Sequence, residues 1–114
     1  MEYMLMIYVN EAGWPKLSKV QQEQGMAAYM AYTEAMQKAG VFKGGGRLHP
    51  SASAATLRAA DGKPNVLDGP YADAKEQLGG FYIIDVADRE AALAWAQRCP
   101  GVGHGAVEVR QICR

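Results

Sequence analysis

The chain has few of the residues from which metal sites, disulfide frameworks and membrane spans are built. It holds only two cysteines and two histidines in 114 residues. No Cys-x-x-Cys and no closely spaced histidine pair occurs, so the sequence predicts that Cys99 and Cys113 are reduced thiols, and that metal and cofactor are absent. No run approaches the roughly 20 apolar residues that a membrane-spanning helix needs.

Net charge is missing as well. The 12 basic and 12 acidic side chains cancel, and the basic ones are scattered along the chain. This pattern gives no electrostatic footprint for nucleic acid. The apolar N-terminal segment lacks the basic start and the small-residue cleavage site of a signal peptide. We therefore expect a cytoplasmic protein with neither a nucleic-acid nor a membrane partner.

Hydrophobic residues, by contrast, are abundant. They make up 49% of the chain, with 21% charged residues, which predicts one globular domain spanning residues 1–114. Residues 2–10 are typical of a strand with two apolar faces. One face carries Tyr3, Leu5, Ile7 and Val9, and the other carries Met4, Met6 and Tyr8. Such a strand is covered on both sides. In so small a chain helices cover one side, and we expect a second subunit on the other.

Two helices are marked by their capping residues. Ser18 and Gln21 form a capping box, and the helix that follows should end before Gly40. Asp88 can cap a second helix over residues 89–99.

The remaining segments predict an antiparallel sheet and a hairpin. Strands are expected over residues 41–47, 54–60, 65–67, 80–86 and 106–112. Their order with the helices is that of a ferredoxin-like βαββαβ frame with an inserted hairpin, which is an α+β fold. Because two helices cover one face of the sheet, the other face would pair with a second copy in a dimeric α+β barrel.

One connection is longer than strand pairing requires. Hairpin loops need two to five residues, but the chain takes about a dozen between Asp68 and the strand that follows Gly79-Gly80. The segment holds four ionisable side chains and one aromatic. A long, chemically rich loop on a small scaffold indicates a functional site.

The same segment carries a family resemblance. Asp68-Gly69-Pro70-Tyr71 is followed by Lys75-Glu76-Gln77-Leu78-Gly79-Gly80-Phe81-Tyr82. A third motif, Val107-Glu108-Val109-Arg110, lies near the end of the sequence. With these motifs the chain resembles the DGPF-motif branch of the YCII-related protein superfamily, with Tyr71 where that motif usually has Phe. The resemblance covers essentially the whole chain.

This resemblance implies a ferredoxin-like subunit that forms a homodimer with a cleft at its interface. The family is largely uncharacterised. The wider superfamily includes a chloromuconolactone dehalogenase, and other relatives are encoded near extracytoplasmic-function sigma factors. An acid–base site around a His and an Asp is often proposed for the superfamily, which implies a small lyase or isomerase.

Asp68 and His104 are therefore the candidate catalytic residues. Asp68 can serve as a cleft general base, or it can accept hydrogen bonds from the backbone N–H groups of residues 70–71, as aspartates in turns commonly do. His104 lies among glycines that leave its ring accessible, and a histidine near neutral pH carries protons both ways. An exposed loop histidine without a role is the alternative.

Four further residues are candidates for substrate binding. They are Arg47, His49, Tyr71 and Glu76. Arg47 follows three glycines and can clamp an anionic ligand, whereas Glu76 can equally be a solvated loop charge.

Three functions remain open. The chain is a small enzyme that acts on a carboxylated molecule as a lactone isomerase or dehalogenase would, a non-catalytic ligand-binding module, or a protein-interaction module, for example one linked to a sigma factor.

Overall fold

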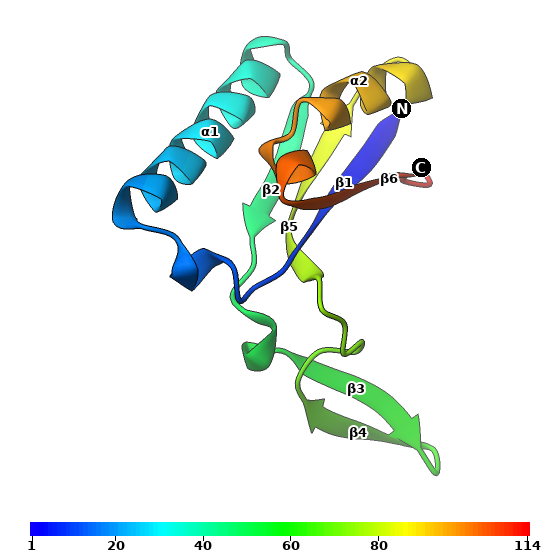
Figure 1. Cartoon of the computed structure of the whole chain (residues 1–114). Helices are drawn as coiled ribbons and strands as arrows, with labels where there is room; N and C mark the ends of the chain where they lie inside the picture. The colour runs from blue at the N-terminus through cyan, green and yellow to red at the C-terminus, as the bar shows by residue number, and fades with distance from the viewer.

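The computed structural model describes residues 1–114 and shows a four-stranded antiparallel sheet in the order β2-β5-β1-β6 (Figure 1). These strands are β1 (Glu2–Val9), β2 (Phe42–Arg47), β5 (Gln77–Asp85) and β6 (Gly105–Gln111). A separate two-stranded sheet consists of β3 (Ala55–Ala60) and β4 (Lys63–Asp68). The helices are α1 (Lys19–Lys38) and α2 (Arg89–Gln97), and short 3-10 turns are η1 (Trp14–Lys16), η2 (Ser51–Ser53) and η3 (Pro100–Gly103). This mixed α+β arrangement is compatible with a ferredoxin-like fold, as predicted.

Both helices begin at the predicted caps. The Ser18 Oγ accepts the Gln21 N–H at 3.1 Å, and the Gln21 Oε1 accepts the Ser18 N–H at 2.9 Å. The Asp88 Oδ1 accepts the Ala91 N–H at 2.9 Å. These side chains satisfy N–H groups that have no partner inside the helix. Helix α2 ends at Gln97, two residues before the predicted end at 99.

The core lies between the two helices and one face of the sheet. Its buried members are Tyr3, Leu5, Ile7, Tyr32, Met36, Ile84, Val86, Ala92, Ala96 and Cys99. The hydroxyl of Tyr32 on α1 donates to the carbonyl oxygen of Trp95 on α2 at 2.7 Å, which fixes the two helices relative to each other. Because odd-numbered residues of β1 point into this core, its even-numbered residues point away from it.

The opposite face of the sheet carries no helix. Strand pairing places Met4 opposite Ile83 and Met6 opposite Phe81, and these side chains are half-buried. On the β2 side, Gly44 and Gly46 pair with Ile83 and Phe81, so no side chain stands over the sheet there. We call this surface, made by Met4, Met6, Tyr8, Phe81 and Ile83, the open face. It is the second apolar face that the sequence predicted for residues 2–10.

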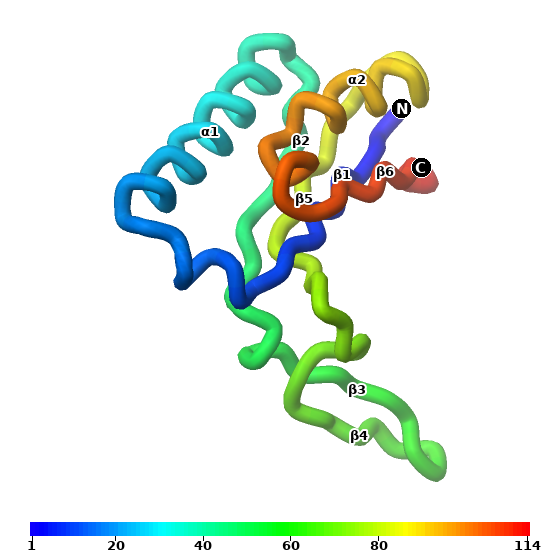
Figure 2. The backbone as a smooth tube through the Cα atoms, in the orientation of Figure 1, coloured from blue at the N-terminus to red at the C-terminus, as the bar shows by residue number.

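The predicted inserted hairpin is present and projects from the body of the molecule. We call residues 55–68, which contain β3 and β4, the arm. It points away from the helices and the sheet (Figure 2), and all of its residues except the half-buried Thr56 are exposed. Strand β5 begins at Gln77 rather than at residue 80, because Gln77 and Leu78 pair with the end of β1 across a bulge. The connection from the arm to β5 is therefore residues 69–76, shorter than predicted.

Both cysteines are free, Cys99 buried and Cys113 exposed. Neither helix combines the length and the apolar character needed to cross a bilayer.

The hydrogen bond between the helices gives a test of the core. Tyr32 is 5% exposed, and Tyr32→Phe would remove this bond and leave the Trp95 carbonyl only the Arg98 N–H at 3.1 Å. We therefore expect a loss of about 1 kcal/mol in the free energy of unfolding. The control is Tyr71→Phe, at a tyrosine that is 77% exposed, where we expect no measurable change. Urea unfolding of both variants measures this, and equal stabilities would contradict the assigned role of the hydrogen bond.

Candidate functional site

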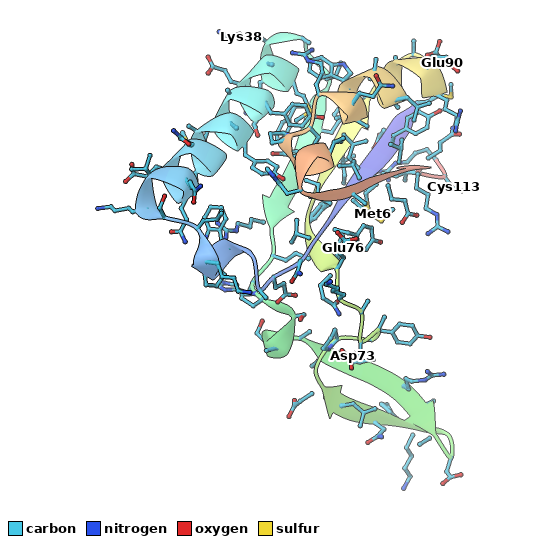
Figure 3. The ribbon with its side chains drawn as sticks, in the orientation of Figure 1. Met6, Lys38, Asp73, Glu76, Glu90 and Cys113 are labelled. Atoms are coloured by element: carbon cyan, nitrogen blue, oxygen red, sulfur yellow. The ribbon has the colours of Figure 1, made fainter.

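An open hollow of about 750 Å³ lies where the arm joins the sheet. It is lined by Tyr8, Asn10, Ala74, Lys75, Glu76, His104 and Ala106. The residues come from the end of β1, the start of β6 and the loop that leads into β5. Glu76 lies at the entry of that loop into the sheet, and Asp73 lies nearer the arm (Figure 3). Polar and ionisable side chains from three segments therefore meet around one concave surface.

Local structure fixes the two loops that supply the hollow. The Gln77 side-chain amide donates to the carbonyl oxygens of Ala72 and Ala74 at 2.8 and 3.0 Å, which holds the loop carrying Lys75 and Glu76. On the other side, a Cβ at position 105 would collide with the Tyr8 carbonyl, so only Gly105 permits β6 to start so close to β1. His104 immediately precedes this glycine.

Tyr8 has a perturbed hydroxyl. Partial burial raises its pKa, and the nearby Glu108 carboxylate raises it further through its charge and a hydrogen bond, whereas Arg110 lowers it. Tyr8 pairs with Ala106, and Glu108 is the diagonal neighbour two residues along β6 on the same face. The hydroxyl therefore stays protonated at neutral pH. It donates its one proton to the Met6 Sδ at 3.9 Å, and its oxygen can accept a hydrogen bond.

The structure brings together two of the predicted site residues, Glu76 and His104. Asp68 lies elsewhere, at the end of β4, and its side chain is exposed. The turn after it is held by Gly69, whose N–H donates to the Ala54 carbonyl at 2.6 Å and whose carbonyl accepts from the Thr56 Oγ1 at 2.9 Å. These bonds hold the turn in place of the predicted ones, in which the Asp68 carboxylate would accept backbone N–H groups of residues 70–71; Pro70 has no N–H to donate.

The other predicted residues are spread around the root of the arm. Arg47 ends β2, and its guanidinium carbon lies 4.8 Å from the centre of a Trp14 ring. Tyr71 is exposed, with the guanidinium carbon of Arg58 5.7 Å from its ring centre. His49 is exposed between β2 and η2. Within one chain these three residues do not line the hollow.

Sequence reasoning missed Tyr8, Asn10 and Lys75 as members of this site. A signal for Tyr8 was present, since it is the polar-tipped residue on a strand face otherwise made by Met4 and Met6. Its role depends on the proximity of β6, which is distant in the sequence.

The chemistry of the hollow follows from its groups. His104 and Glu76 can accept or donate protons, the Lys75 ammonium can attract a carboxylate, and the Tyr8 oxygen can accept a hydrogen bond. No three histidine, cysteine, aspartate or glutamate side chains form a metal-binding group in the chain.

The chain is similar to known proteins along almost its whole length. The YCII-related domain matches residues 1–114. An uncharacterised protein of Rhizobium meliloti (strain 1021) is 37% identical over 114 residues, which cover 98% of this chain and 92% of the relative. The chain therefore belongs to the YCII-related domain family.

The assigned environment of Tyr8 can be tested by titration. Because Glu108 raises the Tyr8 pKa and Arg110 lowers it, Glu108→Gln should lower this pKa and Arg110→Gln should raise it. Carbon-13 NMR of labelled tyrosine, with the Tyr8 signal assigned, measures both shifts. Shifts of the same sign in the two variants would show that Tyr8 does not face both groups.

Proposed function

We propose that this protein is a cytoplasmic, homodimeric small-molecule-binding protein of the DGPF branch of the family, with its ligand in the hollow. The observation that carries the proposal is the meeting of Lys75, Glu76, His104 and Tyr8 around one concave surface. A small carboxylated molecule fits these groups, because the Lys75 ammonium favours its anion. The Asp-Gly-Pro-Tyr segment at residues 68–71 supports the DGPF branch, and two free cysteines fit a cytoplasmic location.

The proposed chemistry is proton transfer, as in a lactone isomerase or a dehalogenase-like lyase. His104 takes or gives the proton, and Glu76 is the carboxylate that lines the same hollow in one chain. Asp68 remains the candidate catalytic carboxylate from the motif, and Arg47, His49 and Tyr71 remain candidate binding groups. These four reach a ligand in the hollow only from another chain or with an extended substrate.

The first test follows both binding and proton transfer. Carboxylated lactones are added to the labelled protein, and amide shifts are expected at Tyr8, Lys75 and His104. In deuterium oxide, exchange of the lactone α-proton reports the acid–base step. We expect His104→Asn to slow this exchange by about 100-fold or more, the usual contribution of a general acid or base.

The control for that test is Glu90→Gln, at an exposed residue in the first turn of α2 outside the hollow. It should leave exchange unchanged. Binding without any catalysed exchange would favour the non-catalytic ligand-binding module. Absence of binding by the whole panel would contradict the proposal.

A protein-interaction module is the second candidate, and one observation favours it. Helix α1 exposes Met26 and Met30 on its outer side, with Met30 71% exposed. These side chains lie one helical turn apart and form an apolar patch outside the hollow. A partner such as a sigma factor would produce amide shifts on α1 rather than around His104.

A further inference from the structure

We propose that the arm packs its apolar face against a second copy of this chain. The arm strands pair only with each other, and no strand of the main sheet bonds to either of them. A lone two-stranded hairpin is at best marginally stable in water. Its ordered form therefore needs a surface to pack on.

One face of the arm is built for packing. Leu57 lies directly opposite Val66, and these side chains are 62% and 58% exposed. Because residues opposite each other and two apart share a face, the same face carries Ala55, Ala59, Pro64 and Asp68. Of the six residues on this face, all except Asp68 are apolar. The other face carries Thr56, Arg58, Ala60, Lys63, Asn65 and Leu67. Four of these six residues are polar or charged, and Leu67 is the one large apolar side chain among them.

The body of the same chain does not supply the packing surface. The root of the arm is braced, because both Glu11 carboxylate oxygens accept the Ser51 N–H at 3.0 and 3.1 Å. The Leu48 N–H donates to the Gly79 carbonyl at 2.9 Å on the other side of the root. From this root the arm points away from the helices and the sheet (Figure 1). Its apolar face must therefore meet another molecule.

A second copy is the occupant that the chain itself favours. The open face is another uncovered surface, apolar on β1 and β5 and bordered on β6 by Glu108 and Arg110, which pair with Met6 and Met4. One two-fold operation brings the arm and the open face of each copy to the other copy. From strand spacing and rise, the whole uncovered face of the four-stranded sheet, with the open face at its centre, spans about 500 Å², and each arm face spans about 200 Å². Sheet contact alone would bury about 500 Å² per copy. If each copy also packs its own arm on the partner and is covered by the partner's arm, the contact buries about 900 Å² per copy. This area is close to the 800 Å² or so per partner of a stable interface.

This inference rests on the homodimer of the proposed function and adds a role for Asp68. Asp68 shares the packing face with Val66, so the arm carries its carboxylate onto the partner. Asp68, which does not line the hollow of its own chain, is thereby an intersubunit residue.

The test compares two matched pairs of substitutions at neighbouring positions of the arm. Leu57→Thr with Val66→Thr removes the apolar pair, and Arg58→Thr with Asn65→Thr removes the adjacent pair on the other face. Sedimentation velocity over a wide concentration range measures the Kd of the dimer. We expect the first pair to raise Kd by about 100-fold or more, because each dimer buries two such pairs. The second pair should leave Kd within about threefold of the original.

A second variant shows whether folding rather than packing is responsible. Residues 55–68 are replaced by two glycines, which join Ala54 to Gly69; these residues already lie 2.6 Å apart from carbonyl oxygen to N–H nitrogen. No arm residue belongs to the core, so the trimmed chain should keep its far-ultraviolet circular dichroism from α1 and α2 and lose the dimer.

An unchanged Kd in the trimmed chain or the Leu57/Val66 variant would overturn the inference, as would a full chain that is monomeric throughout. If the arm variants dissociate while no lactone binds the full chain, the arm inference stands and the proposed function fails.

Discussion

The structure depends on the alternation of β1. This central strand pairs with β5 on one side and β6 on the other, and its side chains point alternately to the two faces of the sheet. Leu5 and Ile7 hold the core under the helices. Met6 and Tyr8, one position away from each, form the open face and the edge of the hollow. A shift of one residue in the pairing would exchange these two sets, so the core and the site are fixed by the same register.

Local signals explain why much of the fold could be predicted. The capping box at Ser18 and the Asp88 cap act within three residues, so their sequence spacing is sufficient to place two helix starts. The apolar alternation of β1 and the turn before Lys63 act over similarly short distances. The start of β5 was misplaced because it depends on the bulge that pairs Tyr8 with Leu78. That pairing joins segments about seventy residues apart, and no local pattern records it.

The candidate site was harder to predict for the same reason. Asp68 and His104 attract notice as residue types, but a site is defined by which segments meet. The loop that ends at Glu76 and the start of β6 both line the hollow with Tyr8, so the carboxylate that shares the hollow with His104 is that of Glu76, the residue before β5. Asp68 is separated from it by the loop of residues 69–76 and lies on a hairpin with its own direction. The sequence motif is continuous along the chain, whereas its members face different surroundings in space.

The absence of net charge bears on how the two uncovered apolar surfaces can exist together. With 12 basic and 12 acidic residues, electrostatic repulsion gives the chain little protection against association. An apolar arm and an apolar sheet face that met in a head-to-tail manner would generate open-ended assemblies. In the proposed dimer, a two-fold arrangement would cover both surfaces at once and leave no free copy of either. The closed symmetry of that proposed pair, rather than charge repulsion, would then limit further association.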